Sequence, residues 1–190
     1  MSELTRCMVF DVESIGLHGQ GFAVGWVLVD EAGREIARDV YACSPDLAAG
    51  REEDRAWVRA HVSNLEQIGP ACTPRDVRNR FWEAWSLART EGATLWADCG
   101  WPVEARFLAS CIYDDLESRQ RSGPYPLHEI ATVRLVAGED PLTINERLPS
   151  ERPKHNPLSD ARQSARLLIA ALHRLRPQTQ GPQAEESHHA

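Results

Sequence analysis

The segment "RCMVFDVE" (residues 6–13) sets a run of apolar residues directly before two acids. Its length and apolar character predict a buried strand. Side chains two residues apart on a strand leave the same face of the sheet, so Asp11 and Glu13 are expected to project together. Such acid pairs also arise by chance, but a carboxylate at the end of an apolar strand needs a partner. A divalent cation is the natural one.

The rest of the chain predicts an α/β fold around this strand. Two more strands, at residues 21–30 and 34–44, complete a three-stranded meander. Apolar residues then recur at helical spacing, Trp57 among them. Helices are expected at 51–68, 73–92, 101–116, 131–138 and from Pro157 onward, strands at 93–99 and 125–130, and an irregular connection at 139–154. A meander followed by such alternation predicts a mixed sheet with helices on its faces, whose reactive groups gather at strand ends.

Composition bounds the class of protein. With 190 residues, of which 42% are hydrophobic and 26% charged, the chain fits one globular domain, residues 1–176. Residues 177–190 are polar and rich in Pro and Gln, so we expect a disordered tail. No apolar run approaches the ~20 residues that span a bilayer, and the N-terminus lacks a signal-peptide core. We therefore expect a cytoplasmic protein with no membrane contact.

Charge and cysteine content narrow the candidate functions. A net charge of −7 argues against broad, non-specific binding of nucleic acid, which depends on Lys and Arg at phosphates. Bound metal ions can still offset acidity locally. The five cysteines show no C-x-x-C pairing, which is typical of reduced thiols and argues against a structural zinc site.

The start of the last helix, "KHNPLSDA" (residues 154–161), has two interpretations. Asn156 is a good N-cap, Pro157 suits the first helical position, and an acid at Asp160 suits the positive end of the helix dipole. This stretch alone therefore favours helix capping, and any functional role of His155 and Asp160 depends on the rest of the chain.

Three segments taken together resemble a known family. "FDVESIGL" (10–17), "ADCGWPVEARFL" (97–108) and "HNPLSDARQSA" (155–165) resemble the motifs of the DEDD superfamily of 3′-to-5′ exonucleases, and the histidine is that of the DEDDh branch. The resemblance implies a ribonuclease H-like fold with a central five-stranded mixed sheet. It also implies two-metal hydrolysis of the terminal phosphodiester, which releases nucleoside monophosphates. The implied metal ligands are Asp11, Glu13 and Asp160, and the implied general base is His155.

The middle motif departs from the family pattern, in which a strand ends in His-Asn and a Phe-Asp opens the next helix. The register of "EARFL" puts Glu104 in the place of that aspartate, whereas Asp98 falls near the expected asparagine. Glu104 has one more methylene of reach. Asp98 stands on the sheet where the other ligands converge, which favours it slightly, and both stay candidate ligands and catalytic residues.

The implied cofactors are two Mg²⁺ or Mn²⁺ ions, about 3.5–4 Å apart, held by oxygen ligands. The expected substrate is the 3′ end of RNA or DNA, single-stranded or a short oligonucleotide, and the sequence does not choose between them. Trp101 and His18 are candidate nucleotide contacts. The alternative for Trp101 is a tryptophan of the core or of a lid, and the alternative for His18 is a loop histidine without a role. The alternative function is a non-catalytic ribonuclease H-like module that binds nucleotides or nucleic-acid ends. A homodimer is compatible with the sequence, which carries no signal of oligomeric state.

Overall fold

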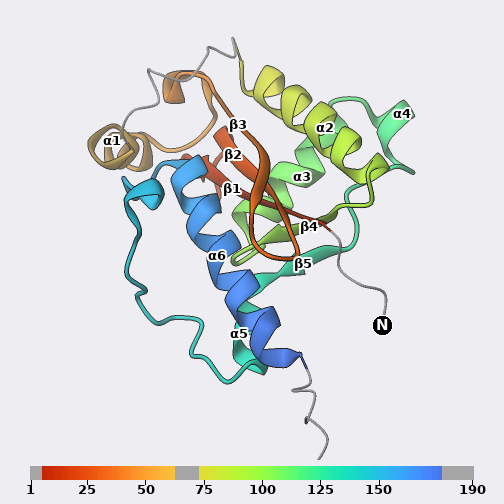
Figure 1. Cartoon of the computed structure of the whole chain (residues 1–190). Helices are drawn as coiled ribbons and strands as arrows, with labels where there is room; N and C mark the ends of the chain where they lie inside the picture. Colours follow the sequence, from red (N-terminus) through yellow and green to blue (C-terminus); the bar gives the residue numbers. More distant parts are fainter. Residues whose placement is uncertain (1–5, 63–72, 177–190) are drawn as a thin grey trace, which may run out of the picture.

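Five strands form one mixed sheet in the order β3-β2-β1-β4-β5 (Figure 1). The computed structural model describes residues 6–62 and 73–176. The strands are β1 (Arg6–Ser14), β2 (Gly21–Asp30), β3 (Glu35–Ala42), β4 (Thr94–Ala97) and β5 (Leu127–Glu129). The first three pair antiparallel, and β4 and β5 add parallel to β1. The predicted α/β fold with a five-stranded mixed sheet is confirmed.

The helices follow the predicted order with some differences in length. They are α1 (Glu52–His61), α2 (Pro74–Thr90), α3 (Val103–Tyr113), α4 (Leu116–Arg119), α5 (Ile130–Val136) and α6 (Pro157–Leu175), with 3-10 turns η1 (Pro45–Leu47) and η3 (Pro149–Glu151). The helix expected at 51–68 ends at His61, and residues 63–68 lie outside the described residues, as does the tail at 177–190. The separate turn α4 and the two 3-10 turns were not predicted.

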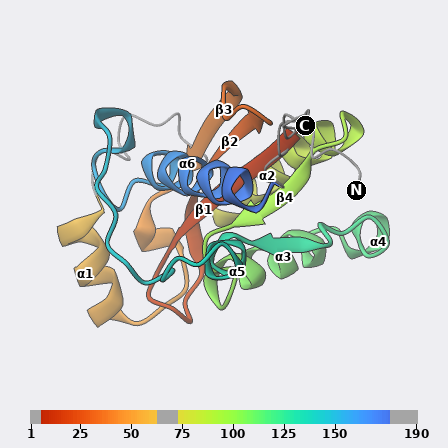
Figure 2. The ribbon, with the colours of Figure 1, turned by 60° about the horizontal axis from the view of Figure 1, so that its bottom comes forward.

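The central strand β1 is buried on both faces, and its two sets of side chains enter different cores. Met8, Phe10 and Val12 join the larger cluster with residues of α2 and α3. Cys7 and Val9 join the second cluster with residues of α6. Because side chains alternate along a strand, Asp11 and Glu13 continue the series that faces α6. Figures 1 and 2 show α6 lying across the sheet and α1 set to one side, beside the N-terminal end of α6.

Beyond Val9 the sheet opens on the side of β4. The parallel pairing of β1 with β4 runs from Cys7 to Val9, whereas the pairing with β2 continues to Ser14. The last part of β1 therefore does not pair with β4, and the backbone of Val12 in this part donates a hydrogen bond to Glu104 at the start of α3. In this way the ends of β1 and β4 and the start of α3 meet at one place.

Gly25 lets α6 approach the sheet beside Asp11. Gly25 of β2 pairs in register with Asp11, and a Cβ at this position would lie 2.2 Å from the backbone nitrogen of Leu158. The first turn of α6 therefore rests directly on the backbone of β2.

We expect Gly25→Ala to displace this turn. Overpacking costs about 1–3 kcal/mol, and each kcal/mol corresponds to a fall of roughly 2–4 °C in the melting temperature of a chain of this size. The control is Gly92→Ala, whose Cβ would meet no atom within 4 Å but whose φ of +82° also disfavours alanine. Calorimetric titration with Mn²⁺ should show weaker binding in Gly25→Ala only. Equal metal affinity in the two variants would contradict the role of Gly25.

Among the described residues, no helix combines the length and the apolar character that crossing a membrane requires.

Candidate active site

The end of β1 carries two acids that resist ionisation. Glu13 is buried, with 9% of its surface exposed, and Asp11 is half-buried. Burial first, then the charges of Asp160 and Glu104, raises the pKa of Asp11 well above its usual range. The same causes raise the pKa of Glu13 to about 7. Carboxylates crowded in this way gain most from a nearby cation.

The start of α6 is both a helix cap and part of the site. The side chain of Asn156 accepts a hydrogen bond from the backbone N–H of Ser159 at 3.2 Å, and Pro157 is the first helical residue, as capping predicts. His155 precedes the cap with φ of 59°, which costs a non-glycine residue about 1–2 kcal/mol. Its backbone N–H donates to Oδ2 of Asp160 at 3.0 Å. The capping turn therefore also fixes the position of the Asp160 carboxylate.

Three predicted site residues converge, although Glu13 lies more than 140 positions from His155 and Asp160 in the chain. Glu13, His155 and Asp160 each offer one ligand atom, and these atoms all lie within 4.8 Å of one another. Burial raises the pKa of Asp160, as it does for the acids of β1. Carboxylate oxygens are the ligands that Mg²⁺ and Mn²⁺ prefer, so the donor set fits a hard divalent cation.

Glu104 is more deeply buried than Asp98, and its charge acts more strongly on the two acids of β1. Glu104 is buried, with 9% exposed, and its charge raises the pKa of both Asp11 and Glu13. Burial raises the pKa of Glu104 itself to about 7, although a hydrogen bond from the backbone of Val12 opposes the change. Asp98 is exposed; desolvation raises its pKa, and Arg134 lowers it. The charge of Asp98 is the last cause acting on the pKa of Asp11, is no cause at Glu13, and also acts on Glu104. The charges on the two acids of β1 therefore favour Glu104 as their neighbour, and the choice of ligand stays a prediction.

Arg147 is a site residue that sequence reasoning missed. Its Nη1 lies 2.5 Å from Oδ1 of Asp160 as an ion pair, and this oxygen accepts no hydrogen bond of good geometry. Arg147 also donates to the backbone carbonyl of Glu151 at 2.9 Å, which ties it to η3. It comes from the connection 139–154, whose irregular sequence gave no sign of where its side chains would lie.

A cavity of about 370 Å³ opens beside the acids. Its walls include Glu13, Leu17, Val103 and His155, together with Trp57 of α1. The ring of Trp57 meets His155 edge-on, with centroids 5.1 Å apart. Trp57 is 46% exposed although it belongs to the apolar stripe of its helix. The sequence did not indicate a place at the site for Trp57, because the stripe already accounted for this residue.

The two residues named as candidate nucleotide contacts lie elsewhere. Trp101 is 72% exposed and lines a different cavity, formed with β5. His18 is exposed, and its backbone carbonyl accepts a hydrogen bond from Arg106. Neither residue lines the cavity beside the acids.

A mixed five-stranded sheet flanked by helices, with acids at the end of β1 and at the start of α6, is the ribonuclease H-like α/β fold. Solved structures share it. Pop2p of S. pombe, in its Mg²⁺- and Mn²⁺-bound form, matches with a TM-score of 0.62 at 12% identity, over 89% of this chain and 83% of Pop2p. E. coli ExoI in its zinc-bound complex with single-stranded DNA matches with a TM-score of 0.57 at 12% identity, over 90% of this chain and 40% of ExoI.

A further structural match is the cell-death related nuclease CRN-4, with a TM-score of 0.50 at 16% identity, over 90% of this chain and 64% of CRN-4. The chain thus spans most of Pop2p but less than half of ExoI. No protein-family model matches the sequence, and no curated protein matches it. At these identities the likeness establishes the ribonuclease H-like fold.

Proposed function

We propose that this protein is a metal-dependent 3′-to-5′ exonuclease that releases nucleoside monophosphates from RNA or DNA. The observation that carries the proposal is the convergence of Glu13, His155 and Asp160 within 4.8 Å, with the half-buried Asp11 and the buried Glu104 as further acids whose charges act on one another. The structural likeness to nucleases and to a Mg²⁺- and Mn²⁺-bound protein supports it.

Each side chain has a distinct part in the proposed reaction. Asp11, Glu13, Glu104 and Asp160 would hold two Mg²⁺ or Mn²⁺ ions, which supply charge stabilisation at the scissile phosphate and a more acidic water. His155 stands half-buried at the rim of the acidic cluster and would accept the proton of the attacking water. Trp57 limits the movement of the imidazole on one side through its edge-on contact. The cavity shared by Trp57, Leu17 and Val103 offers an apolar surface for the terminal base.

The experiment that tests the proposal is incubation of 5′-labelled RNA and DNA oligomers of several lengths with Mg²⁺, Mn²⁺ or chelator. The expected product is a ladder that shortens one nucleotide at a time from the 3′ end, only when metal is present. Internal cuts would contradict an exonuclease. Saturable nucleotide binding without turnover would support the binding-module alternative.

The choice between the two middle-motif acids leads to a paired prediction. Glu104→Gln should lower kcat by roughly 100-fold or more, since a metal ligand contributes several kcal/mol to the transition state. Asp98→Asn should change kcat only a few-fold, because Asp98 is exposed and is the weakest of the charges on Asp11.

Thermal melting of the two variants gives an independent readout. Glu104→Gln removes one charge from the crowded carboxylates, so the metal-free protein should melt at a higher temperature. The opposite ranking of the two kcat values, with the larger loss in Asp98→Asn, would restore Asp98 as the ligand.

A further inference from the structure

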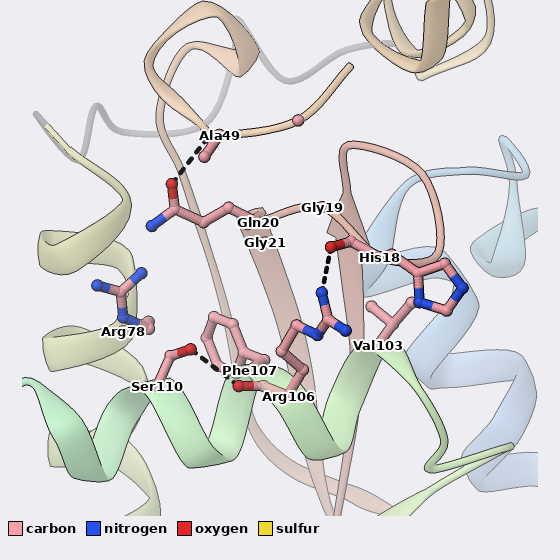
Figure 3. A pocket seen from close by; sticks show the side chains of 11 residues that line it. His18, Gly19, Gln20, Gly21, Ala49, Arg78, Val103, Arg106, Phe107 and Ser110 are labelled. Carbon is pink, nitrogen blue, oxygen red and sulfur yellow. Dashed lines mark hydrogen bonds between the residues drawn. The ribbon is translucent and has the colours of Figure 1, made fainter.

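A second cavity, of about 390 Å³, lies beside the cavity of the candidate active site (Figure 3). Val103, Arg106, Phe107 and Ser110 of α3 line it, at a spacing that places them on one stripe of the helix. Val103 also lines the active-site cavity together with Glu13 and His155. The two cavities therefore share a wall, and the stripe of α3 leads from one into the other.

The loop between β1 and β2 separates the two cavities. Ser14, Gly16 and Leu17 face the active-site cavity, whereas residues 18–21 face the second one. Arg106 donates a hydrogen bond to the carbonyl of His18, so it braces this loop from the side of the second cavity (Figure 3). Arg106 follows Glu104 by two residues, about 3 Å along the helix axis. Two residues correspond to about 200° around the helix, so the guanidinium leaves α3 on a different face from Glu104, on the side of the second cavity.

The second cavity has the opposite charge to the active site. Arg78 and Arg106 line it, and no Asp or Glu does. Arg78 is held by Asp114 through Nε at 2.5 Å and Nη2 at 2.8 Å. Arg106 takes part in none of the ion pairs among the described residues, and its guanidinium donates to a neutral carbonyl, that of His18. In an acidic protein, an uncompensated arginine beside the candidate active site is an attractive place for an anion.

The other polar groups of this cavity also favour an anion. The Oε1 atom of Gln20 accepts a hydrogen bond from the backbone N–H of Ala49 at 2.9 Å, which leaves its NH₂ group as a donor. Figure 3 shows Gln20, Arg78 and Arg106 arranged around the cavity, with the ring of Phe107 between them. Donors surrounding an apolar ring fit a sugar-phosphate unit better than they fit a cation or a purely apolar ligand.

We propose that this cavity, here called the upstream pocket, binds the phosphate of the substrate strand that lies on the 5′ side of the scissile linkage, with Arg106 as its main contact. The proposal rests on the proposed function, and it narrows the preferred substrate to strands of at least three nucleotides or to dinucleotides with a 5′-phosphate. A dinucleoside monophosphate has only the scissile phosphate and leaves the upstream pocket empty.

The test is a binding cycle in Ca²⁺, a hard cation that takes the same oxygen ligands. Calorimetry would compare wild type and Arg106→Gln with a trinucleotide, and with the same trinucleotide carrying an uncharged methylphosphonate at its 5′-side linkage. Each change alone is expected to raise Kd about tenfold, the effect of losing one charge-assisted hydrogen bond. Together they should raise it little further, because both remove the same contact.

Matched controls separate phosphate binding from bracing of the loop. Arg89→Gln is the control variant, because Arg89 is an exposed arginine that also donates to a backbone carbonyl, that of Ser122, and lies outside the upstream pocket. It should leave every Kd unchanged. Arg106→Lys keeps the charge and should recover part of the affinity. A 5′-phosphorylated dinucleotide should show the same dependence on Arg106, which would show that a terminal monoester suffices.

Two outcomes would overturn the proposal. If Arg106→Gln weakens a dinucleoside monophosphate as much as the trinucleotide, Arg106 only braces the loop. If the substitution and the methylphosphonate act additively, Arg106 does not contact this phosphate. Failure of the proposed function is a separate result, because it would show as absent hydrolysis in Mg²⁺ with all substrates, whatever the binding cycle reports.

Discussion

Asp11→Asn is expected to abolish metal-dependent hydrolysis, with kcat falling by roughly 10³-fold or more. Asp11 is the acid on which the others converge, since the charges of Asp160, Glu104, Glu13 and Asp98 all act on its pKa. Asparagine keeps the shape of the side chain but removes a charge that a cation beside these acids needs. The measurement is release of mononucleotides at saturating Mg²⁺, together with calorimetric titration of the metal.

The same variant should be more stable than wild type without metal. One carboxylate fewer relieves the mutual repulsion of the buried acids, so the melting temperature in chelator should rise. Mg²⁺ should raise the melting temperature of wild type and have little effect on the variant, because a ligand stabilises only a protein that binds it. Asp39→Asn, on the exposed strand β3, is the control and should match wild type. Undiminished turnover in Asp11→Asn would contradict the metal-binding role of this cluster.

His155→Ala is expected to lower kcat by about 10²–10⁴-fold, the usual cost of losing a general base. Metal affinity should change little, because the backbone N–H that orients Asp160 is still present in alanine. Histidine occurs at positive φ more often than alanine does, so the substitution adds a small backbone cost at this position. Steady-state kinetics and Mn²⁺ calorimetry on the same preparation separate the two effects.

His173→Ala is the matched control, because His173 is exposed at the far end of α6 and contacts only the carbonyl of Glu31 within the described residues. It should behave as wild type. A collapse of metal affinity in His155→Ala would show that His155 is itself a ligand, since a ring nitrogen of His155 lies within 4.8 Å of carboxylate oxygens of Glu13 and Asp160.

Local patterns in the sequence determined much of the fold. The apolar run before Asp11 predicted a strand, and the alternation of side chains predicted that Asp11 and Glu13 share a face, where α6 lies. The start of α6 was predictable because capping depends on neighbouring residues, here Asn156 and Pro157. Spacing and side-chain chemistry within short segments need no knowledge of the rest of the chain.

Only the tertiary structure shows which other residues lie beside the acids of β1. Whether Glu104 or Asp98 lies nearer to the acids of β1 depends on where the pairing of β1 with β4 ends, and no local pattern encodes this. In the sequence pattern, Trp57 is one residue of an apolar stripe. It contacts His155 only because α1 lies beside the start of α6. The same holds for Arg147, which pairs with Asp160. It also holds for the stripe of α3 that carries Arg106, because this stripe lines its cavity together with segments far away in the sequence. These contacts depend on the packing of whole elements, which the spacing of residues within one element does not determine.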